Sequence, residues 1–361
     1  MIAEFIGVED LRWKRFLERT RHDFFHLPEY VALASKYEGG KAAAFYAEEN
    51  GSAFLAPILI RDLPSELDAP DGWCDATTPY GYPTPIFLPS DDSDSFERFL
   101  EAFQDKGAEQ GIITIFFRLH PLLELPQTPL ARHGTLVKHG QTISLDLSLP
   151  HEVIWRQVRH DHRADICKLE RMGFEVTFDD WSRLDDFVEA YWSTMKRVSA
   201  DDFYLFPECY FADLRTALGS TLHLCTVLSP EGELASAGLF TETGQISQGY
   251  LAGTNEKYLR EAPSKLAIYS EAMWAKEAGN LTFHLGGGVG SRADSLFDFK
   301  AGFSKLRSDF FTFRMVLNES AYAALLSSTS QGDQTAGDHT VKFPPYRNPQ
   351  PRADIPALAP V

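Results

Sequence analysis

The sequence repeats one pattern of predicted elements along most of its length. Residues 24–30 read FFHLPEY and residues 203–210 read FYLFPECY, so both place aromatic side chains before a Pro-Glu pair and a tyrosine. Each copy continues with a helix, a hairpin, a Gly-Tyr step, a second helix and a buried strand. The hairpins cover 41–61 and 222–241, and the Gly-Tyr steps are Gly81-Tyr82 and Gly249-Tyr250. The second helices cover 95–106 and 263–278, and the buried strands cover 111–117 and 281–285. One α/β unit written twice predicts mixed sheets with helices on both faces.

Pro150 marks a boundary in this repeated chain. We expect a first domain over residues 1–150, closed by two strand-like runs about His139-Gly140, and a second domain over residues 151–326. A basic helix over residues 151–172 opens the second domain and ends at Gly173. Residues 327–361 are polar and then proline-rich, without periodicity, so we expect a disordered tail.

Composition excludes several classes of protein. The net charge of −17 disfavours a general nucleic-acid or anionic-membrane binder, although a local basic groove remains compatible with it. The four cysteines are widely spaced, which indicates neither a zinc site nor a dithiol site, and we expect no metal. The acidic start is unlike a signal peptide, and no apolar run is long enough to span a membrane. We therefore expect a cytoplasmic protein.

Residues 281–316 hold the most informative local pattern. A strand over 281–285 leads into the run GGGVG at 286–290, and a short helix follows with Asp294 at its N-cap and Gly302 near its end. The helix carries Lys300 among aromatic side chains, with Leu296, Phe299 and Phe303 on one face. A poorly hydrated ammonium beside the bare backbone of Gly287 and Gly288 suits a developing oxyanion. The alternative is a solvated lysine on a surface helix.

Three further groups of residues are candidates for binding. Tyr80 and Tyr82 lie between prolines, and with Tyr250 they form either an aromatic pocket wall or rigid turns. Arg156, Arg159 and Arg163 share one face of the predicted basic helix, which suits phosphate, or else a solvated face balanced by nearby acids. His284 is a candidate base, although a histidine at a strand end is more often structural. We see no His-Asp or Cys-His constellation for a strong base or nucleophile.

The motif His284-Leu-Gly-Gly-Gly288, followed by LFDFKAGF at 296–303, resembles the FemA/FemB/FemX-like aminoacyltransferases. These are tandem acetyltransferase-fold (GNAT-like) proteins, and the resemblance covers residues 16–316. It implies transfer of an aminoacyl group from the 3′ end of an aminoacyl-tRNA, as co-substrate, to an amine of a small molecule or a cell-wall precursor. Phe299 and Lys300 match the step where donor meets acceptor, so the resemblance implies that Lys300 stabilises charge on the ester carbonyl oxygen. It also places Lys36 near the family's phosphate-binding lysine, and assigns Arg159 and Arg163 to acceptor phosphates or the acceptor stem.

Two departures from related sequences bear on the substrates. Ordinary acetyltransferases bind the pyrophosphate of acyl-CoA at a glycine-rich turn, whereas the matching turn here, residues 253–263, lacks those glycines, and the first copy's turn at 88–94 is acidic. This favours tRNA over CoA as the donor carrier and predicts no bound cofactor. The helical-hairpin arm of many Fem enzymes is missing, so small-metabolite acceptors fit as well as cell-wall precursors. An acyl-CoA-dependent N-acyltransferase and a non-catalytic anion-binding tandem domain remain the alternatives.

Overall fold

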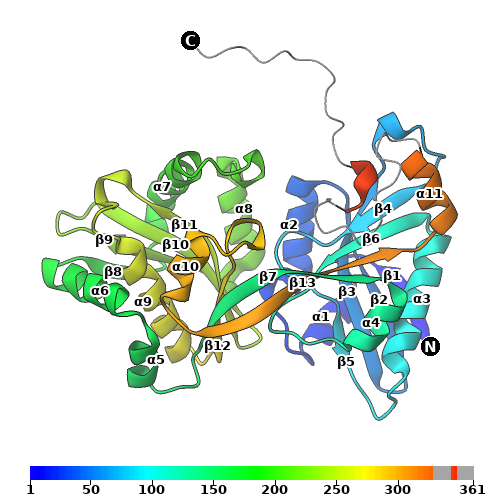
Figure 1. Ribbon diagram of the computed structural model, residues 1–361, viewed down its shortest axis with the longest axis horizontal. Coiled ribbons are helices and arrows are strands. Elements are labelled where there is room, and N and C mark those ends of the chain that lie inside the picture. Colours follow the sequence, from blue (N-terminus) through cyan, green and yellow to red (C-terminus); the bar gives the residue numbers. More distant parts are fainter. Residues whose placement is uncertain (328–342, 348–361) are drawn as a thin grey trace.

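The repeated pattern folds into two similar halves that share one mixed β-sheet (Figure 1). The computed structural model describes residues 1–327 and 343–347, and we call residues 1–150 the first half and residues 151–327 the second half. Within these residues the strands lie in the order β1-β2-β3-β4-β6-β13-β7-β12-β11-β10-β9-β8, with β5 beside β3. The strands are β1 (Ile2–Ile6), β2 (Lys41–Glu49), β3 (Ser52–Asp62), β4 (Cys74–Thr77), β5 (Ile86–Leu88), β6 (Ile112–Arg118), β7 (Thr135–Asp146), β8 (Glu175–Phe178), β9 (Leu222–Leu228), β10 (Leu234–Thr243), β11 (Ile246–Thr254), β12 (Thr282–Gly286) and β13 (Leu306–Val316).

The two halves repeat the same local topology. Each has an antiparallel hairpin, β2–β3 or β9–β10, followed by a parallel pair, β4–β6 or β11–β12, whose connection contains a long helix. Asn50 and Gly51 both adopt positive φ angles in the first hairpin turn, as the Asn-Gly sequence predicts. The predicted mixed α/β architecture is therefore confirmed.

The halves exchange their last strands. β7 belongs to the first half but pairs with β12, while β13 belongs to the second half and pairs with β6; β7 and β13 also pair with each other. The predicted pair of runs about His139-Gly140 is wrong, because β7 is continuous and the register only shifts there, opposite Phe310 and Phe311. The domain boundary at Pro150 stays a prediction, since strands on either side of it pair in one sheet.

Helices cover both faces of this sheet. They are α1 (Leu11–Leu17), α2 (Pro28–Glu38), α3 (Ser95–Glu109), α4 (Gln127–His133), α5 (His151–Gln157), α6 (His160–Met172), α7 (Leu184–Arg197), α8 (Glu208–Leu218), α9 (Pro263–Glu277), α10 (Ser295–Ala301) and α11 (Glu319–Ser327). In the second half α9 packs with α6 on one face, and α7 and α8 lie on the other. The α7–α8 side joins a core that includes Phe24 and Tyr30 of the first half, so the halves meet through buried aromatic side chains.

The predicted basic helix is interrupted. Val158 and Arg159 have extended backbones between α5 and α6, and the Arg159 N–H donates to the Gly302 carbonyl at 2.7 Å. This bond replaces the intrahelical bond that a continuous helix would make. The expected single face of three arginines is therefore wrong, because Arg156 lies on α5 and Arg163 on α6.

Most of the predicted tail, residues 328–342 and 348–361, lies outside the described residues. Residues 343–347 are described, and they pack on the first half. Tyr346 is buried and its hydroxyl bonds Thr114 Oγ1 at 2.7 Å, while Arg347 forms an ion pair with the buried carboxylate of Asp75. The expectation of disorder is wrong for these five residues, because Tyr346 fills a hydrophobic cluster with Ile113 and Tyr322.

Candidate active site

The glycine-rich loop and α10 fold as their sequence predicts. Asp294 is the N-cap of α10: its Oδ1 accepts from the Phe297 N–H at 2.9 Å, and its Oδ2 accepts from the Val289 N–H at 2.8 Å. Gly286 has a φ of +72°. A side chain at Gly288 would place its Cβ 2.1 Å from the Arg292 carbonyl oxygen, so only glycine fits there.

Lys300 lies at the far end of α10 and turns back to this loop. Its Nζ donates to the Gly287 carbonyl at 2.9 Å. Lys300 as a whole is partly exposed, but its ammonium is desolvated, and this burial lowers the pKa of Lys300 from 10.5 to about 8 against the opposing field of Asp294. The lysine therefore remains mostly protonated at neutral pH while lacking the hydration of a surface lysine.

Tyr82 brings the first half to the same place. A Cβ built on Gly286 would lie 3.4 Å from Tyr82 Oη and 3.6 Å from Lys300 Nζ, so a hydroxyl and an ammonium flank one glycine. The Tyr82 ring lies 5.3 Å from the ring of His284 and 5.4 Å from that of Phe310. The fold therefore brings Tyr82 of the first half next to Gly286 and Lys300 of the second half.

Tyr80 and Tyr250 belong to an adjacent chain of hydroxyl groups. Tyr250 is the extra residue of a β-bulge, since Leu239 pairs with Leu251 and Phe240 with Gly249. The Tyr30 hydroxyl donates to the Tyr80 carbonyl at 3.0 Å, so it accepts from Tyr250 at 3.3 Å, and Tyr250 in turn accepts from Tyr210 at 2.7 Å. Burial raises the pKa of Tyr250 well above its ordinary value, which keeps the chain neutral.

Phe25 links the two tyrosine groups. Its ring centroid lies 5.8 Å from that of Tyr82 and 6.2 Å from that of Tyr250. Gly81 (φ +103°) permits this contact, because a Cβ there would lie 2.1 Å from the Phe25 ring. Tyr80, Tyr82 and Tyr250 thus line a continuous seam between the halves, with Lys300 at one end.

Phe299 and the basic residues lie outside this seam. The Phe299 ring packs against His162 at 5.4 Å, and the Phe299 carbonyl accepts from His162 Nε2 at 3.0 Å, so Phe299 anchors α10 to α6. Phe303 is buried beside it, whereas Leu296 is 39% exposed, so the predicted three-residue apolar face is only partly buried.

Arg159 and Lys36 are engaged in ion pairs. Arg159 pairs with Asp298 on α10 at 3.3 Å and with Asp161 at 3.1 Å, and Arg163 lies one turn further along α6. Lys36 on α2 pairs with Asp213 on α8 at 2.5 Å, across the junction of the two halves. The structure therefore does not bring Lys36 or Arg163 to Lys300.

A buried Asp-His pair, which no local pattern in the sequence indicates, lies beside this seam. Asp23 and His120 are 97 residues apart, fully buried, and 2.9 Å from each other. Leu122 N–H donates to His120 Nδ1, so the Nε2–H of a neutral imidazole donates to Asp23. Burial raises the pKa of Asp23 to about 7 and lowers that of His120 to about 3. No spacing rule predicts this pair, because the two side chains meet only in the tertiary fold.

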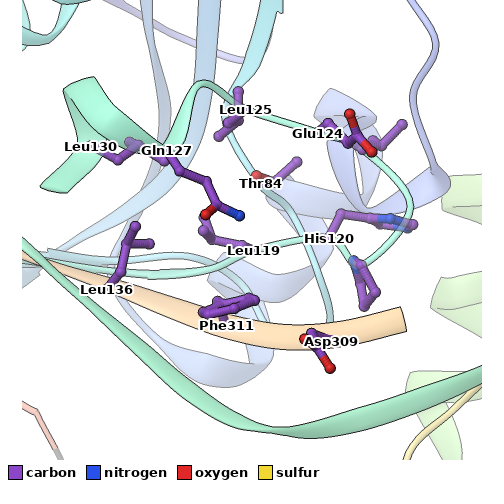
Figure 2. Close-up of a pocket in the computed structure, with 12 residues that line it drawn as sticks. Thr84, Leu119, His120, Glu124, Leu125, Gln127, Leu130, Leu136, Asp309 and Phe311 are labelled. Atoms are coloured by element: carbon purple, nitrogen blue, oxygen red, sulfur yellow. The ribbon is translucent and has the colours of Figure 1, made fainter. Parts of the chain in front are cut away.

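A cavity of about 590 Å³ opens beside His120, between loops of the first half and strand β13 (Figure 2). Aliphatic side chains form one side, and polar side chains come from Thr84, His120, Glu124, Gln127 and Asp309. The Thr84 hydroxyl is buried without a hydrogen-bond partner in the described residues, whereas Asp309 is held by Lys138 at 2.6 Å. The cavity thus offers hydrogen-bond acceptors next to an apolar wall.

The described residues contain neither a candidate metal cluster nor a candidate membrane-spanning helix. No group of three or more His, Cys, Asp or Glu side chains in residues 1–327 and 343–347 has the arrangement of a metal site. No helix in that part of the chain is long and apolar enough to cross a bilayer.

Comparisons with known proteins agree with this architecture. Residues 156–300 match the family model described as an acetyltransferase (GNAT) domain. The structure is similar to the crystal structure of FemX, with a TM-score of 0.70, 14% identity, and coverage of 89% of this chain and 99% of that one. It is also similar to L-PGS from Bacillus licheniformis, with a TM-score of 0.54, 16% identity, and coverage of 93% and 100%.

A third similar structure is the C-terminal domain of a putative lysylphosphatidylglycerol synthetase from Agrobacterium fabrum, with a TM-score of 0.51, 14% identity, and coverage of 88% and 93%. No curated protein matches the sequence. The predicted fold class, with two GNAT-like units in tandem, is confirmed, and the resemblance to FemX holds at the level of the fold.

Proposed function

We propose that this protein is an acyltransferase that moves an aminoacyl group from an aminoacyl-tRNA to the amine of a small-molecule or cell-wall-precursor acceptor. The observation that carries the proposal is the desolvated Lys300 ammonium, held against Gly287 and opposite the Tyr82 hydroxyl. The fold shared with FemX, and the aminoacyl product named in lysylphosphatidylglycerol synthetase, support an aminoacyl donor.

The reaction needs a positive charge where the carbonyl oxygen becomes negative. The amine nitrogen attacks the ester carbonyl carbon, a C–N bond forms, and the C–O bond to the 3′ oxygen of the tRNA breaks. A lysine that is poorly hydrated before reaction stabilises the oxyanion more than a solvated lysine would, because little water must be displaced. Lys300 fills this role, and Tyr82 adds a hydroxyl donor from the other half. Phe299 supports it by fixing α10.

The entrance to α9 argues against acyl-CoA as the donor. In a GNAT domain this helix start follows the β11 strand, where a pyrophosphate would meet backbone N–H groups. Here Pro263 is the first residue of α9 and has no N–H, and Glu261 lies two residues before it. The Glu261 Oε2 atom is buried without a partner in the described residues, so its charge opposes a diphosphate.

The cavity beside His120 suits the non-reacting part of the acceptor. A second, non-reacting ammonium group of the acceptor would need hydrogen-bond acceptors, which Glu124, Gln127 and Thr84 supply there. The aliphatic wall suits a substrate with a hydrocarbon portion, such as a diamino acid or a peptide side chain. His120 lines this cavity and lies 5.9 Å, ring to ring, from Tyr82, which places the cavity next to the Lys300 site.

An acyl-CoA-dependent N-acyltransferase is the second candidate, because the matched family is that of GNAT acetyltransferases. Titration calorimetry with CoA and with a non-hydrolysable aminoacyl-tRNA mimic separates the two candidates. We expect binding of the mimic alone, and amide product only when charged tRNA is supplied with an amine. Product from acyl-CoA, with none from charged tRNA, would refute the proposal.

A further inference from the structure

A row of polar side chains crosses the sheet under Tyr82. In the strand register Gln248 of β11 lies opposite His284 of β12, which lies opposite Ser144 of β7. Side chains directly opposite each other project from the same face of a sheet. The neighbours Phe283 and Leu285 pack with α9 on the other face, so this row faces the first half.

The hydrogen bonds of Gln248 define the tautomer of His284. Gln248 Nε2 donates to the Gly249 carbonyl at 2.8 Å, which leaves Gln248 Oε1 facing His284 Nδ1 at 2.6 Å. A carbonyl oxygen accepts, so the proton of the neutral imidazole is on Nδ1 and the lone pair is on Nε2. The ring is thus oriented with a basic nitrogen on its far side.

Two atoms of this row lack partners. Among the described residues, His284 Nε2 and Ser144 Oγ have no hydrogen-bond partner, and both side chains are at least 99% buried. Buried polar groups are nearly always paired, and exceptions occur where function requires them. A ligand that satisfies both atoms must donate a hydrogen bond to Nε2, as an ammonium or amine does.

The position of His284 is one where a substrate reaches a sheet. β11 and β12 are parallel and pair only over Ile246–Gln248 and Thr282–His284, so the pairing ends at His284. The half-buried ring of Tyr82 covers His284 from the first half. Crevices at the carboxyl ends of parallel strands are the usual ligand sites of α/β sheets.

The groups around His284 favour its unprotonated form. Burial is the main cause that lowers the pKa of His284, and His120, which follows β6 and lies 5.7 Å away ring to ring, and Lys300 of α10 lower it further. His120 is neutral and donates to Asp23 behind it; Tyr82 is also neutral, because burial raises its pKa to about 12. His284 is therefore unprotonated at neutral pH, with the lone pair of Nε2 free to accept a proton.

We propose that His284 Nε2 takes the proton from the attacking amine and that Ser144 completes the position where this amine binds. The inference rests on the proposed function. The acceptor ammonium gives one proton to Nε2, and its nitrogen then attacks the ester carbonyl carbon. The imidazolium, unstable beside Lys300, passes that proton to the 3′ oxygen as the ester C–O bond breaks. The second N–H proton is released to water, so the products are an amide, a free 3′ hydroxyl and one proton.

The test compares His284→Gln, Ser144→Ala and His223→Gln in single-turnover transfer from charged tRNA. His223 is a matched control, since it is a mostly buried histidine of the second half, on β9. Its Nε2 also has no hydrogen-bond partner in the described part of the chain, although Glu242 Oε1 lies 3.7 Å away. We expect His284→Gln to lower the rate about 100-fold or more, as loss of a general base does, with tRNA binding unchanged. We expect Ser144→Ala to raise the acceptor KM about tenfold, and His223→Gln to change neither.

The pH profile separates a base from a structural residue. We expect His284→Gln to remove the fall of the rate at acidic pH, and ¹⁵N NMR of the wild-type protein to show Nε2 shifting when the acceptor amine is added. The NMR test needs no variant, so it decides the question even if His284→Gln does not fold. Wild-type rates and an unchanged profile in His284→Gln, or no Nε2 shift, overturn the inference. Absence of transfer by the wild-type protein overturns the proposed function instead.

Discussion

Replacing Lys300 by methionine should make the protein more stable and much less active. Lowering the lysine pKa from 10.5 to about 8 corresponds to roughly 3 kcal/mol, at about 1.4 kcal/mol for each pH unit. Since part of the side chain is exposed, we expect a measured gain of about 1–2 kcal/mol in the free energy of unfolding at pH 7. Loss of an oxyanion-stabilising group should lower the transfer rate about 10²–10³-fold.

The lowered pKa of Lys300 also makes the stability of the wild-type protein depend on pH. Between about pH 8 and pH 10.5 the unfolded wild-type chain keeps a proton on this lysine that the folded protein has released, so wild-type stability rises with pH. The advantage of Lys300→Met is therefore complete below pH 8 and shrinks above it. Urea unfolding at several pH values measures this.

Lys305→Met is the matched control, because Lys305 is exposed on the same connection after α10, and we expect it to change neither quantity. A Lys300→Met protein that is less stable than wild type, or that keeps its transfer rate, would show that the ammonium is neither desolvated nor catalytic.

Three further perturbations test other parts of the structure. Burial raises the pKa of Glu271 to about 8, so the folded protein holds a proton that the unfolded chain releases above about pH 4.5. The free energy of unfolding should therefore fall as the pH rises towards 8. Urea unfolding of Glu271→Gln should show a smaller fall over the same pH range. Gly288→Ala should abolish most transfer activity, because the new Cβ displaces the glycine loop. Gly7→Ala is the control, since nothing lies within 4 Å of a Cβ there, and it should keep the wild-type rate. Equal transfer rates in the two variants would contradict the close contact between Gly288 and the Arg292 carbonyl. Glu124→Gln should raise the acceptor KM severalfold at constant kcat, and Glu101→Gln on the exposed side of α3 should have no effect; steady-state kinetics with varied amine decide it.

Local patterns in the sequence were sufficient to predict the loop and the helix around Lys300. The N-cap Asp294, the glycines before it and the start of α10 depend on interactions within a few residues, so their spacing predicts them. The repeat of helices and hairpins is likewise local, and it led to the duplicated α/β fold.

Local patterns failed where a distant partner determined the backbone. The basic helix breaks at Arg159 because its N–H bonds Gly302, which lies 143 residues later in the chain. The sequence of β7 suggests two separate strands, whereas the structure has one strand with a bulge where its register with β13 shifts. Neither partner is visible in the neighbouring residues, so helical and strand periodicity alone predicted the wrong element.

Residue spacing and backbone freedom are sufficient to predict two copies of one folding unit, and a lysine at the end of a short helix that follows a glycine loop. Three features follow only from the folded chain: β7 and β13 cross between the halves, Tyr82 faces Lys300 across Gly286, and Gln248 orients His284. These contacts join strands and loops far apart in the chain, and burial of the shared sheet is what brings them together.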